Sequence, residues 1–177
     1  MEKPVTSLTP FERLSLMNQL TILKKLDTDN AEDYANHIEI LHSGYSVLYG
    51  EVFQAVFEEM PLDECKYVFD VLDMFRNLIN SFNGLKDKQG LTAEDVRFQG
   101  FDGNNETKRW AFAEYLKKTG RWQETLVGGL NSHSMMTMRR YPQMLERYEP
   151  IKQRILDSHT GNWQLTAEQI KVVIGQK

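Results

Sequence analysis

The sequence contains very little of several features that define whole classes of proteins. It has one cysteine, Cys65, among 177 residues, so an intramolecular disulfide is impossible and a disulfide-stapled secreted scaffold is excluded. No apolar run reaches the roughly 18 residues that a membrane-spanning helix requires. The first residues lack the basic start and apolar centre of a secretory signal peptide. We therefore expect a cytoplasmic protein that does not act in the membrane.

The sequence also lacks a strong excess of charge of either sign. The net charge is −4, which argues against a general nucleic-acid-binding protein. The charge is unevenly distributed: residues 1–95 carry −9, residues 96–155 carry +5 and residues 156–177 are neutral. The simplest interpretation is that the acidic segment 1–95 and the basic segment 96–155 neutralise each other within one fold. The alternatives are a basic face for an anionic ligand, or complementary faces that meet between copies of the chain.

Helical signals dominate the rest of the sequence. A capping box at 9–12 places proline at the first helical position, and a second capping box stands at 166–169. Apolar residues recur at helical spacing between these points, and Gly44 and Gly120 are placed to end helices. The pattern predicts helices over about 10–26, 31–43, 45–56, 62–85, 105–119, 141–155 and 166–174. Residues 121–137 are expected to be irregular, and Pro142 or Pro150 to bend the helix that follows.

The predicted helix at about 62–85 is the strongest element. Most of its residues are apolar, and the apolar arc exceeds half of the circumference, which is more than a surface helix needs. We expect it to pack on two sides, either as the central helix of the fold or as a helix shared with another copy. Five residues form a narrow polar stripe along it: Lys66, Asp70, Asp73, Asn77 and Asn80.

These patterns predict an all-α, multi-helical single domain over residues 1–177, built around the long central helix at about 62–85. The length is that of one domain, and a chain of this size can bury roughly 70% of the surface that its unfolded form exposes. At most a very short strand is expected, at 96–98, where Val96-Arg97-Phe98 has an extended pattern.

The segment Val96–Glu106 is the most distinctive part of the sequence, because it is aperiodic and rich in glycine, aspartate and asparagine. Helices in a helical protein need only short connections, so this composition marks a place to look for function. The alternating oxygen-bearing residues from Asp102 suggest calcium. An EF-hand loop beginning at Asp102 would need glycine and glutamate where Thr107 and Ala113 stand, so that match fails. A turn followed by a helix cap is the simpler interpretation.

Other catalytic and metal-binding patterns are missing. The four histidines form no His-Glu-x-x-His motif, and one cysteine cannot provide a cysteine pair for zinc. Ser132-His133-Ser134 is not a nucleophile elbow, and Gly128-Gly129 is not followed by the lysine of a phosphate-binding loop. The sequence therefore predicts no catalytic residue, no metal ligand and no cofactor.

Basic and aromatic residues occur together in three short clusters, at 108–110, 117–122 and 139–141. Arginine and aromatic planes together can hold phosphates or stack bases, so single-stranded nucleic acid is one candidate ligand. Solvated helix faces with snorkelling side chains explain the same clusters. Because the whole chain is acidic, we expect nucleic acid not to be a partner and rank this candidate last.

The sequence resembles a known family over nearly its whole length. The resembling residues are Arg13-Leu14, Asn18-Gln19, Gly44-Tyr45, Phe98-x-Gly100-Phe101-Asp102, Glu106, Gly120-Arg121-Trp122, Asn131 and Leu165-x-Ala167-x-x-Ile170. In this order they resemble the YfbU family of uncharacterised bacterial proteins. The resemblance implies an all-α, bacterial, cytosolic protein that self-associates. It implies no activity and transfers no catalytic residue.

Three hypotheses about function follow. The first is a self-associating, non-enzymatic helical protein that acts by binding, either to itself or to a protein partner. The second is a small-ligand or enzymatic site at the 98–106 loop, with Asp102 as acceptor or general base, Arg121 holding an anion and Trp122 lining the pocket. The candidate ligand-binding residues of that site are Phe98, Phe101, Asp102, Arg121 and Trp122. The third is binding of single-stranded nucleic acid by the basic segment 96–155.

Overall fold

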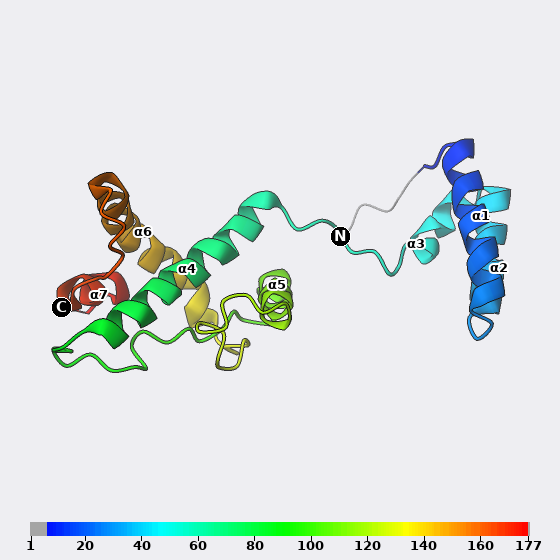
Figure 1. Ribbon diagram of the computed structural model, residues 1–177. Helices are drawn as coiled ribbons and strands as arrows, with labels where there is room; N and C mark the ends of the chain where they lie inside the picture. Colours follow the sequence, from blue (N-terminus) through cyan, green and yellow to red (C-terminus); the bar gives the residue numbers. More distant parts are fainter. Residues whose placement is uncertain (1–6, 177) are drawn as a thin grey trace. The chain divides into compact units, whose positions relative to one another are not determined.

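The computed structural model describes residues 7–176 and consists of helices and their connections (Figure 1). The helices are α1 (Pro10–Leu26), α2 (Ala31–Ser43), the 3₁₀ helix η1 (Ser46–Leu48), α3 (Tyr49–Val52), α4 (Leu62–Gly84), α5 (Thr107–Lys118), α6 (Met135–Ser158) and α7 (Ala167–Ile174). Within the described residues there is no strand, only one isolated parallel bridge between Phe101 and Asn131. The predicted all-α fold is confirmed. Across residues 7–176, no helix combines the length and the apolar character needed to cross a membrane.

The chain divides into two compact units, Met1–Glu59 and Met60–Lys177. We expected a single domain over residues 1–177. Whether the two units pack together as one domain stays a prediction.

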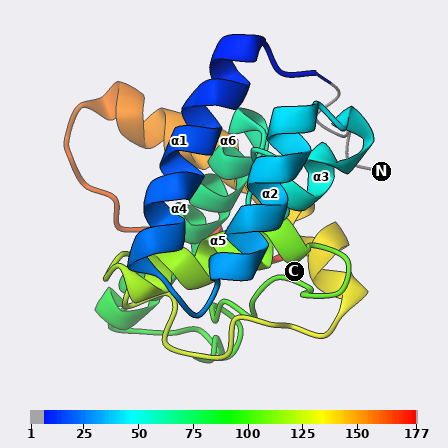
Figure 2. The same cartoon turned by 90° about the vertical axis from the view of Figure 1, so that its right-hand side faces the viewer.

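The first unit is a helical hairpin in which α1 and α2 lie side by side (Figure 2). The predicted capping box opens α1: the Thr9 hydroxyl accepts from the Glu12 N–H at 3.2 Å, and the Glu12 carboxylate accepts from the Thr9 N–H at 2.7 Å. Gly44 ends α2 with a φ of 72°, a conformation that glycine adopts without strain. The core of this unit is small, and its buried apolar residues are Ile40, Leu41 and Tyr49.

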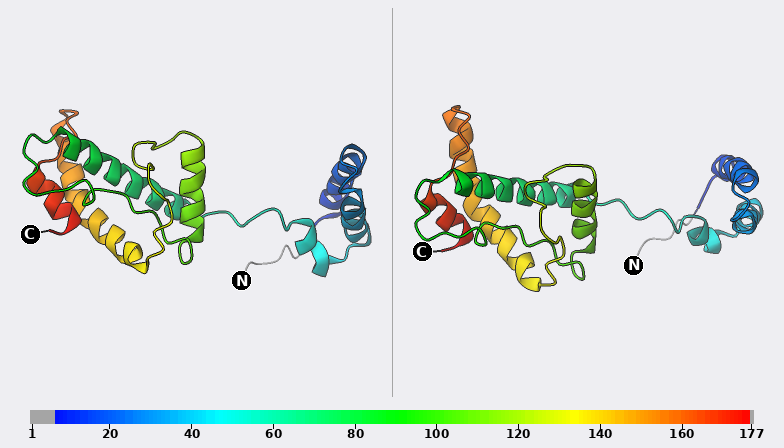
Figure 3. Two further views of the ribbon diagram at one scale, coloured as in Figure 1. Left: turned by 90° about the horizontal axis from the view of Figure 1, so that it is seen from below. Right: turned by 60° about the horizontal axis from the view of Figure 1, so that its bottom comes forward.

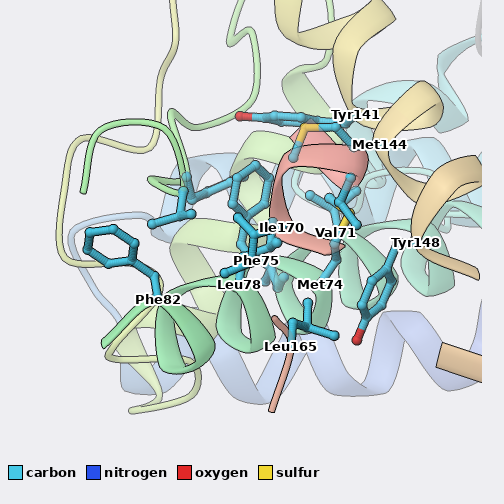
Figure 4. Close-up of a cluster of buried hydrophobic side chains, with 14 of the residues drawn as sticks. Val71, Met74, Phe75, Leu78, Phe82, Tyr141, Met144, Tyr148, Leu165 and Ile170 are labelled. Atoms are coloured by element: carbon cyan, nitrogen blue, oxygen red, sulfur yellow. The ribbon is translucent and has the colours of Figure 1, made fainter. Parts of the chain in front are cut away.

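The second unit is built around α4. At about 1.5 Å per residue this helix is roughly 35 Å long. Its apolar face is buried against α5, α6, α7 and the connecting loops (Figure 4). Helix α5 lies at the N-terminal part of α4, and α7 lies near its C-terminal end (Figures 1 and 3). The buried residues of α4 are Val68, Val71, Leu72, Met74, Phe75, Asn77, Leu78, Ser81 and Phe82. Helix α4 is therefore the central helix of this unit, as the width of its apolar arc predicts.

The C-terminal end of α4 is closed by side chains from elsewhere in the chain. The Lys88 ammonium donates to the Phe82 carbonyl at 2.6 Å and lies 3.8 Å from the centre of the Phe82 ring. The Gln164 amide donates to the Ser81 carbonyl at 2.6 Å. These donors bind carbonyl groups of the last helical turn, where the helix supplies few N–H partners, and the Phe82 carbonyl also accepts from the Leu85 N–H at 3.3 Å. They also tie the 85–91 and 159–166 segments to α4.

The predicted helix at 45–56 is wrong in extent. The structure has the three-residue η1 and the four-residue α3 in this region, and the chain after Phe53 is not helical. Tyr49 is buried, whereas Tyr45 is 50% exposed and Val56 is 73% exposed. Apolar periodicity stabilises a helix mainly through tertiary packing, and in this segment only Tyr49, Val52 and Phe53 pack on the small core of the unit.

The boundaries of two later helices also differ from the prediction. Helix α5 begins at Thr107, with Glu106 at the N-cap position, rather than at about residue 105. Helix α6 begins at Met135 because the Ser134 hydroxyl accepts from the Met136 N–H at 3.2 Å, so residues 135–137 are helical rather than irregular. Pro142 and Pro150 lie within the single continuous α6.

Val96 and Phe98 are buried without forming a strand, so the short strand considered at 96–98 is not present. The loop they belong to is fixed by Gly100. This residue has a φ of 92°, and a Cβ atom placed on it would lie 2.3 Å from the Leu130 carbonyl oxygen. The close approach allows the Phe101 N–H to donate to that carbonyl at 3.0 Å. The Tyr141 hydroxyl donates to the Gly100 carbonyl at 2.9 Å.

This geometry predicts that Gly100→Ala destabilises the protein more than Gly90→Ala. Both positions have positive φ, so alanine costs about 1–2 kcal/mol in backbone strain at either one. A Cβ atom added at Gly90 would meet no other atom within 4 Å, whereas the Gly100 substitution displaces a backbone carbonyl, which adds about 1–3 kcal/mol. Urea unfolding of the two variants measures the difference, and equal losses of stability would contradict the packing described for Gly100.

Candidate functional site

Two of the five residues predicted for a ligand site are core residues. Phe98 and Phe101 are 2% and 0% exposed, and their ring centres lie 5.4 Å apart in an edge-to-face arrangement. Both rings also pack on Tyr141. Phe98 additionally lines a cavity of about 430 Å³ that Phe101, Asp102, Arg121 and Trp122 do not line.

Asp102 has a structural role at the turn before α5. Asp102 is 2% exposed, and its carboxylate accepts from the Asn105 side chain at 2.6 Å and from the Asn104 N–H at 3.0 Å. The Asn105 side chain and the Asn104 N–H both lower the pKa of Asp102. A carboxylate with a lowered pKa is a weak base near neutral pH. This arrangement matches the interpretation of Asp102 as a turn cap more closely than its assignment as a general base.

Arg121 and Trp122 both follow α5, but their side chains lie in different environments. Arg121 is exposed, and its side chain makes no hydrogen bond or ion pair with other residues of the 7–176 segment, Asp102 included. The Trp122 ring stacks on Phe69 with a centre distance of 5.2 Å, and its N–H donates to the Asp73 carboxylate at 2.8 Å. The structure therefore brings Phe98 and Phe101 together but does not join Asp102, Arg121 and Trp122 into one pocket with them.

A cavity lined by Asn105 and Glu106, close in sequence to Asp102, contains an ion-pair network. It measures about 370 Å³ and is lined in part by Glu64, Glu106 and Arg109. The Arg109 guanidinium donates to both oxygens of Glu64, at 2.6 and 2.9 Å, and to Glu106 at 2.7 Å. Its hydrogen bonds lower the pKa of Glu64. This network stabilises the contact between α4 and α5 and leaves Arg109 committed to internal carboxylates.

Several cations of the basic segment 96–155 also bind groups within the protein. The Lys117 ammonium donates to the Gly128 carbonyl at 3.2 Å, and the Arg147 guanidinium donates to the Val173 carbonyl at 2.8 Å. The Arg140 guanidinium donates to the Asp95 carbonyl at 3.4 Å. These cations bind the protein's own backbone, so part of the positive charge of this segment serves to hold loops and helix ends in place.

A different cavity lies along the polar stripe of α4. It measures about 410 Å³, within the size range of pockets that hold small molecules. Helix α4 contributes four of the five stripe residues and Arg76, helix α6 contributes one face, and the 159–166 segment contributes one tryptophan. The lining residues are Asp70, Asp73, Arg76, Asn77, Asn80, Leu145, Tyr148, Glu149, Lys152 and Trp163. We refer to this space as the stripe cavity.

The floor of the stripe cavity is a buried polar pair. The Asn77 amide donates to the Tyr148 hydroxyl oxygen at 2.9 Å, and these residues are 8% and 4% exposed. The Asn77 carbonyl oxygen accepts from Ser81 at 3.3 Å. Burial raises the pKa of Tyr148, so the hydroxyl keeps its proton at neutral pH. Within residues 7–176 the Tyr148 hydroxyl makes no hydrogen bond besides the one from Asn77, which leaves its proton available as a donor.

The walls of the stripe cavity carry ion pairs. Lys66 and Asp70 lie 2.5 Å apart, Lys152 and Glu149 lie 3.5 Å apart, and Arg76 pairs with Asp73 at 3.6 Å and with Glu124. The lining contains three carboxylates and two cations, so its formal charge is −1. Trp122 does not line the cavity, but it contacts two residues that do. Its N–H donates to the Asp73 carboxylate, and its ring centre lies 5.1 Å from the Arg76 guanidinium.

Trp163 forms an aromatic side of the stripe cavity. It is 41% exposed, and within the described chain its ring stacks on no other ring and its N–H has no hydrogen-bond partner. An exposed tryptophan of this kind offers a flat apolar surface and a polar edge to a bound molecule.

Sequence reasoning found the stripe but not the cavity. The spacing of Asp70, Asp73, Asn77 and Asn80 showed that they share a helix face, and two asparagines on such an apolar helix were a usable signal. The partner Tyr148 stands 71 residues further along the chain. Nothing local in the sequence shows which helix covers the stripe.

Among residues 7–176, no group of three or more histidine, cysteine, aspartate or glutamate side chains is arranged to hold a metal ion. Cys65 is a free thiol, partly buried at the start of α4, and its sulfur donates to the Met60 carbonyl at 3.8 Å.

Comparison with known proteins gives one consistent result. The sequence profile of a family described as the YfbU domain matches residues 6–175. The chain is also similar to a UPF0304 protein of Methanocaldococcus jannaschii, with 33% identity over 158 residues that cover 80% of this chain and 88% of the relative. The resemblance stated from the sequence is therefore confirmed, and the chain belongs to the YfbU family.

Proposed function

We propose that this protein binds a small organic molecule in the stripe cavity. The observation that carries the proposal is the buried Asn77–Tyr148 pair at the floor of a cavity of about 410 Å³. Burying an amide and a hydroxyl is costly unless both are hydrogen-bonded, and a core of leucine and phenylalanine would avoid that cost. A polar pair that remains at the cavity floor offers directed hydrogen bonds to a bound molecule.

The lining favours a planar ligand with a positive charge. Trp163 supplies an open ring surface, and Tyr148 supplies a hydrogen-bond donor. The three carboxylates exceed the two cations of the lining, so the formal charge of −1 favours a monocation over an anion. The proposed ligand class is therefore a small aromatic amine.

This proposal belongs with the expectation of a helical binding protein in the bacterial cytoplasm. It replaces the loop at 98–106 as the preferred place for a small ligand, because the loop's conspicuous residues are used in packing and capping. Nucleic acid remains the third hypothesis, and its basic segment has several cations bound to the protein's own backbone.

The charge preference can be measured with three probes that share one ring. We expect tryptamine to bind about tenfold more tightly than indole-3-acetate, with indole between them, because one unit charge near partly exposed carboxylates is worth about 1–4 kcal/mol. Isothermal titration calorimetry at low and high salt gives the three dissociation constants. Equal affinities would contradict the charge argument, and no binding by any probe at millimolar concentration would contradict the proposed ligand class.

The position of the bound ring can be tested by truncating Trp163. We expect Trp163→Ala to weaken tryptamine binding by about tenfold, since an aromatic pair contributes roughly 0.5–1.5 kcal/mol beyond the area that it buries. Tyr115→Ala is the matched control, because Tyr115 is an aromatic residue on α5, 56% exposed and outside the stripe cavity. If both variants bound tryptamine as the unmodified protein does, the ligand would not lie in the stripe cavity.

A further inference from the structure

A second cavity lies beside the C-terminal half of α4 and has no lining residue in common with the stripe cavity. It measures about 430 Å³ and is formed by three segments of the second unit: residues 79–83 of α4, residues 93–98 and residues 124–128. We refer to it as the loop cavity. Phe82 lines the loop cavity and Tyr148 lines the stripe cavity, and the two side chains lie at opposite sides of the buried cluster in Figure 4.

The interior of the loop cavity is mostly apolar. Phe82, Val96 and Phe98 line it and are buried, and Ile79 lines it and is partly buried. An apolar molecule that enters such a space leaves water and gains contact with these side chains. The volume lies within the range of pockets that hold small molecules.

One polar group in the wall of the loop cavity has no partner. Thr125 lines the cavity and is 4% exposed, and its hydroxyl makes no hydrogen bond with any other group of residues 7–176. A buried hydroxyl without a partner costs free energy, so its presence requires an explanation. Rotation between staggered rotamers exchanges the hydroxyl and the methyl group of a threonine, which lets the hydroxyl meet a polar group placed in the cavity.

A second buried threonine shows the usual arrangement. Thr137 is 2% exposed, and its hydroxyl donates to the Ser134 carbonyl at 2.8 Å. The same hydroxyl lies 3.0 Å from the Ser132 hydroxyl. Burial of a threonine in this chain is therefore compatible with full hydrogen bonding, and the unpartnered hydroxyl of Thr125 is a local feature of the loop cavity.

The charged groups that line the loop cavity are paired. Arg97 donates to the Glu94 carboxylate at 3.2 Å, and Glu124 forms an ion pair with Arg76. Each of the three ionisable residues of the lining thus has an oppositely charged partner. A charged ligand would compete with these pairs and would lose its hydration in the apolar interior, so an uncharged ligand is favoured.

We propose that the loop cavity binds a small uncharged molecule with an apolar body and one hydroxyl group, such as a phenol. The apolar body lies against Phe82, Val96 and Phe98, and the hydroxyl group bonds to the Thr125 hydroxyl, which can both donate and accept. This site is separate from the stripe cavity and does not rest on the function proposed for it.

The first test compares p-cresol with toluene, which lacks only the hydroxyl group. Thr125→Val keeps the shape of the side chain and removes its hydroxyl. We expect this variant to bind p-cresol about three- to tenfold more weakly, the effect of one hydrogen bond, and to bind toluene as the unmodified protein does. The amide chemical shifts of Val96 and Phe98, followed in NMR titrations, give the two dissociation constants within the loop cavity itself.

The second test blocks the cavity. Ala93 is exposed and lines the loop cavity, so the indole ring of Ala93→Trp takes space that the ligand needs. We expect this variant to lower the affinity for p-cresol by at least about tenfold, because a close-packed site cannot hold both rings. Ala111→Trp is the matched control, since Ala111 is exposed on α5 and lies outside both cavities.

The third test asks whether the Thr125 hydroxyl is unpaired when no ligand is added. Thr125→Val is expected to raise the melting temperature, because it removes a buried hydroxyl that has no partner. The same substitution at Thr137 is expected to lower the melting temperature, since it removes the hydrogen bond to Ser134.

Four results would overturn the proposal. No binding of p-cresol at millimolar concentration would exclude the ligand class, and shifts confined to the amides around Tyr148 and Trp163 would place p-cresol in the stripe cavity. Equal weakening of p-cresol and toluene by Thr125→Val would exclude a hydrogen bond from Thr125 to the ligand. A melting temperature that falls with Thr125→Val as it does with Thr137→Val would show that the protein already satisfies this hydroxyl.

Discussion

The burial of α4 on every side except its polar stripe is the constraint on which the second unit depends. Nine residues of α4 are buried, so α5, α6, α7 and the loops between them must surround the helix. The stripe cannot enter that core without partners for its polar groups. Asn77 is buried because Tyr148 and Ser81 bind it, and Asp70, Asp73 and Asn80 also line the stripe cavity. The cavity thus follows from the same pattern that makes the core.

The sequence predicted best the elements whose signals are local. Capping boxes at Thr9 and Thr166 and the αL glycine Gly44 placed helix ends to within a residue, because each rests on bonds between near neighbours. Prediction failed where packing decides. The 45–56 segment packs on the small core of its unit only through Tyr49, Val52 and Phe53, and the stripe cavity depends on a contact between α4 and α6. The 98–106 loop was distinctive for a structural reason, because Gly100 must admit the Leu130 carbonyl and Asp102 must cap a turn.

Several residues that carry the family resemblance have such structural roles. The Asn131 side chain accepts from the Gly103 N–H and from the His133 N–H, each at 3.0 Å, and so joins the 98–106 loop to the segment before α6. Glu106 accepts from the Asp102 N–H at 3.2 Å and from Arg109 at 2.7 Å. Together with Gly100 these residues close the loop over the aromatic cluster of Phe98, Phe101 and Tyr141. These residues therefore account for the conformation of the loop.

Native-state hydrogen exchange tests the central claim about α4 most directly. If α4 is the core of the second unit, the amides of Val71–Leu78 exchange only when the whole unit unfolds, and their opening free energy equals the free energy of unfolding measured with denaturant. The amides of α5 and α7, the helices that pack against α4, exchange at opening free energies equal to or lower than those of Val71–Leu78. If Val71–Leu78 exchanged through a local opening, well before the amides of α6, then α4 would not be the element on which this unit depends.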